Sequence, residues 1–98
     1  MNIKEISGKD LEKLDDSYRI IDVRSKEEYK NGHIKNAINI PLDKIKAHDF
    51  NLDKNDKLVI HCMTNARSMR AIEILISKGY KDLTLAPGVA LYKYDLVK

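Results

Sequence analysis

A single cysteine, Cys62, is the residue of this 98-residue chain that is best suited to nucleophilic chemistry. It follows the apolar run at residues 58–60 and His61, and four residues separate it from Arg67. A thiol between a strand end and a helix start lies where loop N–H groups, the helix N-terminus and a guanidinium can stabilise its thiolate. We therefore expect Cys62 to react as a thiolate inside a loop that binds anions.

The loop that follows Cys62 is predicted to bind the substrate. Closing so short a loop turns several backbone N–H groups inward, and a concave row of N–H groups suits an anion. The predicted binding residues are Met63, Thr64, Asn65, Ala66 and Arg67, and Ser68 is a predicted supporting residue. A buried structural role is the alternative for a lone cysteine. The position of Cys62 at a strand end, with an arginine after it, favours the reactive role.

The elements that must position this loop are short β-branched runs that alternate with helical patterns. Strands are predicted at residues 3–6, 19–23, 37–40, 58–61 and 83–85. The runs at 20–21 and 58–60 are continuously apolar, which is typical of strands that are covered on both faces.

Capping residues mark where helices begin between these strands. Ser7, with Asp10 three residues later, predicts a helix start before Leu11 and Leu14. A capping-box pattern of Ser25 and Glu28 predicts a second helix start. Residues 43–57 are polar and charged, which indicates a short helix followed by a surface loop.

The clearest helix is predicted at residues 67–78, directly after the cysteine loop. Met69, Ile72 and Ile76 recur at helical spacing and are expected in the core, and Gly79 is suited to a left-handed C-cap. Its N-terminus would therefore face Cys62.

Strands that alternate with helices predict an α/β fold with a mainly parallel five-stranded sheet flanked by helices. In such folds the ligand site lies beyond the carboxyl ends of the strands. The length predicts one domain over residues 1–98.

Composition excludes several classes of function. Lysine and arginine number 18 against 15 acidic residues, so the formal charge of +3 is mild, and neither a basic stripe nor tryptophan is present to favour nucleic-acid binding. Apolar runs such as residues 74–76 are too short to cross a bilayer, and the first residues lack the apolar stretch of a signal peptide. A cytoplasmic monomer with no membrane association is expected.

Histidines offer no second centre of chemistry. His61 precedes Cys62 on a strand, so its side chain should point to the opposite face and not contact the thiol. His33, His48 and His61 lack metal-ligand spacing, and one cysteine excludes an intrachain disulfide, so no metal site is expected.

Four segments in order resemble the rhodanese-like domain family, and together they cover nearly the whole chain. They are residues 20–29, residues 32–41, the Cys62 loop, and residues 79–89. The resemblance implies a three-layer rhodanese-like domain that acts as a single-domain sulfurtransferase. It also implies that Asp22, Arg24 and His33 support the site, mainly by bracing loops.

The activity that the resemblance implies is transfer of a sulfane sulfur through a Cys62 persulfide, without a cofactor. The donor would be a small anion such as thiosulfate, or a persulfide, and the acceptor would be cyanide or a thiol, including a protein thiol. Rhodanese loops have four residues between cysteine and arginine, as here, whereas the related dual-specificity phosphatases have five. The smaller ring favours a sulfur atom over a phosphoryl group.

Two alternatives remain open beside the sulfurtransferase. A non-catalytic regulatory or sulfur-carrier module that binds a partner protein is one, because Thr64 and Asn65 replace the Ser and Gly that are frequent in the family, and Pro87-Gly88 replaces a Gly-Gly pair. A phosphatase or arsenate reductase is the other, which the loop length disfavours. Asn65 tolerates the left-handed conformation well, so the loop is still expected to close.

Overall fold

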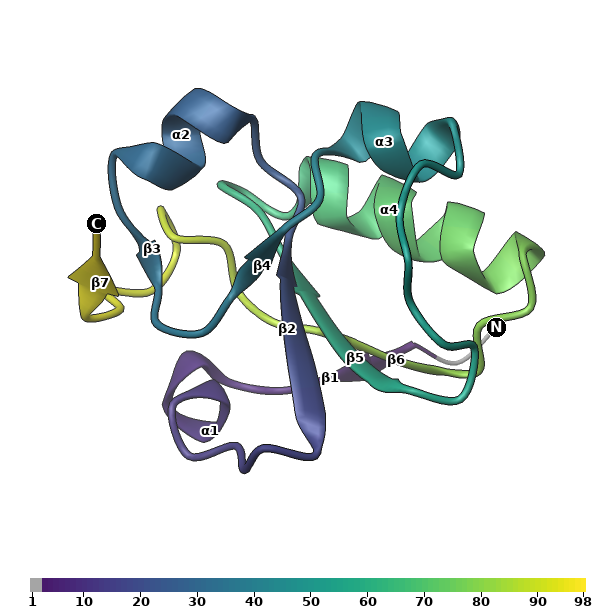
Figure 1. The fold of residues 1–98 in the computed structure, drawn as a ribbon. Coiled ribbons are helices and arrows are strands. Elements are labelled where there is room, and N and C mark those ends of the chain that lie inside the picture. The colour runs from purple at the N-terminus through teal and green to yellow at the C-terminus, as the bar shows by residue number, and fades with distance from the viewer. Residues whose placement is uncertain (1–2) are drawn as a thin grey trace.

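A computed structural model describes residues 3–98, so Met1 and Asn2 of the predicted domain lie outside the described residues. Five parallel strands form one sheet in the order β1-β6-β5-β2-β4 (Figure 1). The strands are β1 (Lys4–Glu5), β2 (Tyr18–Asp22), β4 (Ile38–Asn39), β5 (Lys57–His61) and β6 (Asp82–Leu85). The predicted α/β fold is confirmed, and each of the five predicted strands overlaps one of these.

The central pair of strands carries the site. β2 and β5 run in register, with Ile21 opposite Ile60 and Asp22 opposite His61. Residues 58–60 of β5 are all buried, because this strand is covered on both faces. The carboxyl ends of both strands therefore meet at one edge of the sheet, where Cys62 leaves β5.

Within residues 3–98, four helices connect the strands, and the first two of them begin at the predicted caps. They are α1 (Gly8–Leu11), α2 (Lys26–Lys30), α3 (Leu42–Lys46) and α4 (Ala66–Ser77). The Ser7 side chain accepts from the Asp10 N–H, and the complete capping box of Ser25 and Glu28 begins α2. The first helix is shorter than predicted, since it ends at Leu11 and leaves Leu14 beyond it.

Helix α4 confirms most of its prediction and corrects one part. Gly79 follows it with φ +94°, as a left-handed glycine, and Ile72 is fully buried. Met69 was predicted in the core but is 38% exposed. The buried face of α4 is centred between Ser68 and Leu75, and at 3.6 residues per turn Met69 lies about a third of a turn from that centre. A polar residue, Ser68, occupies the sheet-facing position that apolar spacing alone assigned to Met69.

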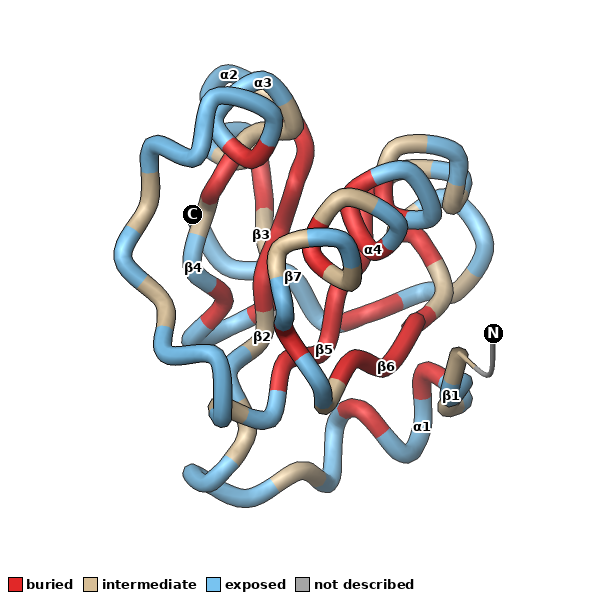
Figure 2. Tube along the Cα trace, turned by 90° about the vertical axis from the view of Figure 1, so that its right-hand side faces the viewer, coloured by how far each residue is buried: buried red, intermediate tan, exposed pale blue. Residues whose placement is uncertain are grey.

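Two apolar clusters pack on opposite faces of the sheet (Figure 2). Helices α3 and α4 cover one face, with Ile45, Ile72 and Leu75 fully buried there. Helix α1 covers the other face through Leu11, together with Tyr94 from the C-terminal segment. The result is the three-layer arrangement that the resemblance implied.

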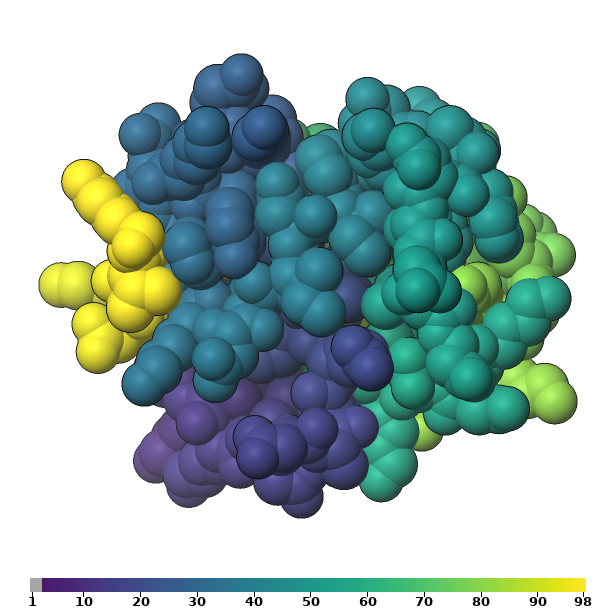
Figure 3. All heavy atoms as spheres, viewed as in Figure 1, coloured from purple at the N-terminus to yellow at the C-terminus, as the bar shows by residue number. Residues whose placement is uncertain are grey.

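A second, two-stranded sheet was not predicted. β3 (His33–Ile34) pairs antiparallel with β7 (Leu96–Val97). Figure 3 shows the C-terminal residues, in yellow, against the blue segment that contains β3. Strands of two residues are too short to show a hydrophobic alternation, so sequence periodicity could not reveal them.

None of the helices within residues 3–98 has the length and apolar character needed to cross a membrane. The longest of these, α4, has 12 residues.

Replacing Ile72 and Met69 separately by alanine tests the corrected face of α4. Ile72→Ala should lower the free energy of unfolding by about 2–5 kcal/mol, because it leaves a cavity in the core. Met69→Ala on the same helix should cost less than about 1 kcal/mol, since this side chain is partly exposed. Urea unfolding followed by circular dichroism measures both values, and equal losses would contradict the assigned face.

Candidate active site

The thiol of Cys62 is held by Ser68, the residue that faces the sheet from the first turn of α4. Only 1% of Cys62 is exposed. The Ser68 N–H donates to Sγ at 3.3 Å, and the thiol donates to Ser68 Oγ, also at 3.3 Å. Ser68 Oγ in turn donates to the Asn65 carbonyl oxygen at 3.0 Å. The sulfur therefore has a fixed position beneath the loop.

A run of N–H groups without acceptors among residues 3–98 follows Cys62 directly in the chain. The backbone N–H groups of residues 63–67 have no hydrogen-bond acceptor among residues 3–98. The N–H groups of Ala66 and Arg67 are free because they open α4, where the first N–H groups lack intrahelical partners and carry partial positive charge. The predicted binding residues thus form a set of unsatisfied donors beside Cys62, which is the requirement for binding an anion.

Asn65 gives the loop its turn. Its φ of +75° is left-handed, as its residue type allowed. Its side-chain Oδ1 accepts from the Gly88 N–H at 2.8 Å, so the same residue joins the loop to the segment after β6. Asn65 therefore supplies both a backbone conformation and a tertiary contact, and a glycine could supply only the first.

Gly88 completes the closure from the other side. A Cβ atom at this position would collide with the carbonyl group of Met63, so only glycine allows the two backbones to approach. Next to it, the Val89 N–H donates to the Cys62 carbonyl oxygen at 2.9 Å, and the Ala90 N–H donates to the Met63 carbonyl oxygen at 3.0 Å. Val89 and Ala90 thus bind the carbonyl groups of Cys62 and Met63, while the N–H groups of residues 63–67 remain without acceptors among residues 3–98.

Arg67 is paired with Glu28, a partner that the sequence did not reveal. Its Nη1 and Nη2 donate to Oε1 at 2.6 Å and to Oε2 at 2.9 Å. This bidentate pair lowers the pKa of Glu28 to about 2 and raises the pKa of Arg67. The sequence pattern identifies Glu28 only as the third residue of a capping box, which the structure confirms. That pattern does not indicate the pairing of Glu28 with Arg67. No local pattern could have shown that α2 reaches α4.

Asp22 and Arg24 form a buried ion pair at the carboxyl end of β2. Arg24 Nη2 donates to Asp22 Oδ2 at 2.8 Å and to the Gly32 carbonyl oxygen at 2.8 Å, and Arg24 Nε donates to Asp22 Oδ1 at 3.0 Å. Both side chains are almost fully buried. The pair ties β2 to the turn before β3, which is a bracing geometry.

The side chain of His33, on β3, contacts Tyr29 of α2. Its Nδ1 lies 2.9 Å from the Tyr29 carbonyl oxygen, and its ring stacks on the Tyr29 ring with centroids 3.8 Å apart. The Tyr29 hydroxyl donates to the Ala37 carbonyl oxygen at 2.6 Å. These contacts join α2 to the turn that follows it, which is a bracing geometry.

His61 is fully buried, and neither ring nitrogen has a hydrogen-bond partner among residues 3–98. Its ring lies on the sheet face opposite Cys62, with the Tyr94 ring centroid 6.3 Å away and Nε2 3.9 Å from Asp22 Oδ2. Burial lowers the pKa of His61, so the ring is neutral at neutral pH. Sequence alternation therefore placed it correctly, away from the thiol.

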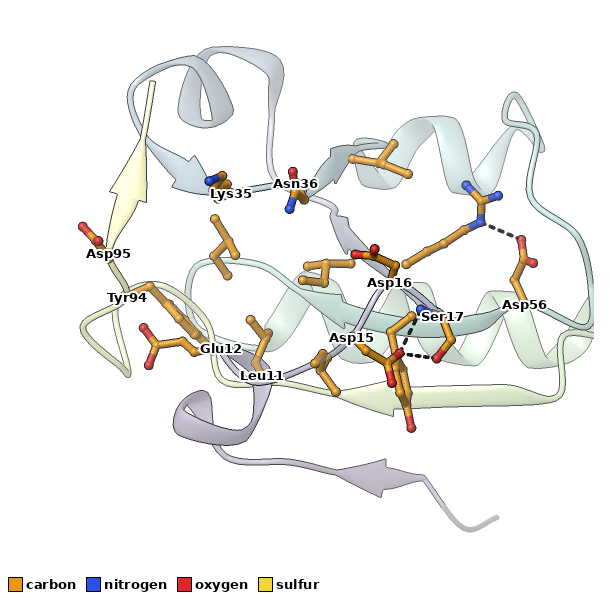
Figure 4. A pocket seen from close by; sticks show the side chains of 16 residues that line it. Leu11, Glu12, Asp15, Asp16, Ser17, Lys35, Asn36, Asp56, Tyr94 and Asp95 are labelled. Atoms are coloured by element: carbon orange, nitrogen blue, oxygen red, sulfur yellow. Dashed lines mark hydrogen bonds and ion pairs between the residues drawn. The ribbon is translucent and has the colours of Figure 1, made fainter.

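Two cavities, of about 670 and 740 Å³, lie elsewhere on the molecule, and no residue of the 62–68 loop lines either one. Figure 4 shows the smaller cavity, whose lining includes acidic side chains such as Asp16 and Asp95 together with the apolar side chain of Leu11. Within residues 3–98, no three side chains of His, Cys, Asp or Glu are grouped so that they could hold a metal ion. The Cys62 loop, with its thiol and its N–H groups that lack acceptors among residues 3–98, remains the candidate active site.

Substitutions at Asn65 separate its two contributions. Asn65→Gly keeps the left-handed turn and loses the Gly88 contact, so the free energy of unfolding should fall by about 1 kcal/mol. Asn65→Ala loses the contact and strains the backbone as well, for a total of about 2–4 kcal/mol. Chemical denaturation of both variants checks the order, and an alanine variant as stable as the glycine variant would contradict it.

The depressed pKa of His61 predicts a pH-dependent stability. The unfolded chain binds this proton more readily than the folded one, so the free energy of unfolding should fall as pH drops below about 6.5. Glu28 acts in another window: its pairing stabilises the fold above about pH 4.5, and this stabilisation is lost as pH falls towards 2.

A variant His61→Phe should therefore lose the part of the decline that begins near pH 6.5 and keep the more acidic part. Urea unfolding at a series of pH values measures this. A wild-type stability that is flat between about pH 7 and pH 5 would contradict the assignment.

Comparison with known proteins identifies relatives that are similar to this chain in sequence. A family model described as Rhodanese-like domain matches residues 7–92. The thiosulfate sulfurtransferase PspE of Escherichia coli is 39% identical over 71 residues, which are 70% of this chain and 68% of PspE. The Bacillus subtilis protein YrkF, which bears the name of a sulfur carrier protein, is 34% identical over 76 residues, and this match spans 76% of the chain but 41% of YrkF.

Solved structures agree with the sequence comparisons. The crystal structure of a rhodanese-like domain protein from Staphylococcus aureus superposes with a TM-score of 0.84 at 29% identity, and the match covers 97% of each chain. The family match extends over the capping box of α2, the Cys62 loop and the segment at Gly88. The chain therefore belongs to the family of rhodanese-like domains.

Proposed function

We propose that the protein is a rhodanese-type sulfurtransferase that carries a sulfane sulfur on Cys62 as a persulfide. The observation that carries the proposal is the run of N–H groups at residues 63–67 that lack acceptors within residues 3–98 and directly follow the buried thiol of Cys62 in the chain. A terminal persulfide sulfur is anionic and small, and it would accept hydrogen bonds from these donors. The name of PspE, a thiosulfate sulfurtransferase, supports the same activity.

The reaction would proceed in two displacements. In the first, the Cys62 thiolate attacks the outer sulfur of thiosulfate; a new S–S bond forms, and sulfite leaves with the electron pair of the broken bond. In the second, cyanide or a thiolate attacks the terminal sulfur, and Cys62 leaves as a thiolate. Dividing one transfer into two through a covalent intermediate lowers the barrier to each step.

Residues of the Cys62 loop and its neighbours would have distinct parts in this scheme. The loop N–H groups would hold the transferred sulfur, and the Ser68 N–H, 3.3 Å from Sγ, would stabilise Cys62 each time it carries negative charge. Asn65 and Gly88 would keep the ring closed at a size that fits one sulfur atom. The partners are then a sulfur donor and a thiol or cyanide acceptor.

A sulfur-carrier role is the second candidate. The similarity to YrkF favours it, because that relative bears the name of a sulfur carrier protein. A carrier would also form the Cys62 persulfide but would pass the sulfur to a dedicated partner protein and not to cyanide or a free thiol. Turnover with cyanide distinguishes the two.

Replacing Cys62 by serine tests the proposal directly. The hydroxyl is nearly isosteric but cannot form a persulfide, so thiocyanate production from thiosulfate or a persulfide should vanish while the circular dichroism spectrum stays the same. Intact-mass spectrometry should show one added sulfur atom on the donor-treated wild type and none on Cys62→Ser. Persistent thiocyanate production by the variant would refute the role of Cys62.

A further inference from the structure

We propose that Glu28, acting through Arg67, sets the donor preference of the Cys62 loop and directs it to organic persulfides in place of thiosulfate. This inference rests on the proposed function and narrows it to one substrate class. It follows from the charge of the loop, from the charge of the two donors and from the side chains that border the loop.

The side chains of the loop supply almost no free charge to a bound donor. Residues 63–66 are uncharged, so Arg67 is the one charged side chain between Cys62 and Met69. Its guanidinium is held by both carboxylate oxygens of Glu28, at 2.6 and 2.9 Å. The two side chains are about one-third exposed, so the pair is partly shielded from solvent. Together, Arg67 and Glu28 therefore present no net charge to a bound donor.

The next charges beyond this pair also cancel. Asp22 acts on Arg67 electrostatically, but it is bound to Arg24 in the buried pair at the end of β2. On α4, Arg70 lies 3.8 Å from Glu73, and both are more than half exposed. The attraction that the loop offers an anion therefore comes mainly from its N–H groups and the helix N-terminus, which are short-ranged.

The two donors place different charges in this neutral site. Thiosulfate carries two negative charges, and its reaction needs the Cys62 thiolate, so three negative charges meet; a persulfide and two-charged sulfite result. An organic persulfide carries one charge as the anion R–S–S⁻, and it can take up the proton of Cys62, so that the thiolate attacks neutral R–S–SH. The bond between Sγ and the terminal sulfur forms, the S–S bond of the donor breaks, and the leaving R–S⁻ takes the proton of the transferred sulfur. One negative charge enters and one remains.

Electrostatics favour the second reaction where no cation is free. Bringing three like charges together in a partly shielded site costs free energy that a neutral ion pair does not offset. A single charge fits what five N–H groups and one helix end can stabilise. Removing the carboxylate of Glu28 would leave Arg67 as a net cation beside the loop and would shift the balance towards thiosulfate.

The border of the loop suits the organic group of such a donor. Met69 is 38% exposed and Leu91 is 58% exposed. Backbone hydrogen bonds place both residues near the loop. The Met69 N–H donates to the Asn65 carbonyl oxygen. The Leu91 N–H donates to the carbonyl oxygen of Gly88, which lies against the Met63 carbonyl group. Exposed apolar side chains at these positions offer contacts to a carbon chain and none to the sulfonate of thiosulfate.

Single-turnover loading of Cys62 tests the preference. Reduced protein is mixed with sodium thiosulfate or with freshly prepared N-acetylcysteamine persulfide, which is otherwise uncharged, and intact-mass spectrometry follows the addition of one sulfur atom. The wild type should load from the persulfide at least about tenfold faster than from thiosulfate. Cys62→Ser, treated in parallel, measures any loading elsewhere.

Two variants assign the preference to Glu28. Glu28→Gln removes the charge but keeps an acceptor for the capping box of α2, so the fold should persist. In this variant the rate of loading from thiosulfate should rise. The ratio of the persulfide rate to the thiosulfate rate should therefore fall by about fivefold or more. Glu27→Gln removes the same charge from the neighbouring position, where no contact with Arg67 exists within residues 3–98, and should leave the ratio within about twofold.

The outcomes separate this inference from the proposed function. A wild type that loads as fast from thiosulfate as from the persulfide overturns the donor preference and leaves the sulfurtransferase standing. A ratio that Glu28→Gln does not change, or that Glu27→Gln changes equally, overturns the role of Glu28. Loading from neither donor refutes the proposed function itself. The wild-type ratio needs no variant, so the preference is tested even if Glu28→Gln unfolds.

Discussion

The proposed chemistry depends on keeping five consecutive backbone N–H groups, those of residues 63–67, without partners among residues 3–98. Unpaired N–H groups are costly to bury, so a folded chain normally pairs them. Here the start of α4 leaves some of them free by necessity, and residues 88–90 bind the carbonyl groups of the loop and not its N–H groups. Two features hold the loop in this state: the turn at Asn65, with its contact to Gly88, and the space that Gly88 leaves for the Met63 carbonyl group.

Sequence reasoning recovered the parts of this arrangement that local patterns encode. The buried strand β5, the caps at Ser7 and Ser25, and the glycine after α4 each have a signature within a few residues, and each was found. The five-stranded parallel sheet followed from the alternation of such elements. The left-handed turn at Asn65 could be expected from the residue type alone.

Features that depend on long-range contacts could not be predicted in this way. The pair between Glu28 and Arg67 joins residues 39 positions apart, and a capping box already explained Glu28. The exposure of Met69 followed from the role of Ser68 at Cys62, which a hydrophobic pattern does not register. The short sheet of β3 and β7 lacks any periodicity. In each case the deciding partner came from a distant part of the chain.

The contact of Gly88 with the Cys62 loop also has a consequence for how the chain is made. Synthesis runs from the N-terminus, so the loop emerges well before residues 88–90 and before β6, which completes the centre of the sheet. Until that later segment docks, the carbonyl groups of Cys62 and Met63 have no partners and the loop cannot close. We therefore expect the nascent thiol to be an ordinary exposed cysteine and the loop to take its final form only after residues 88–90 dock.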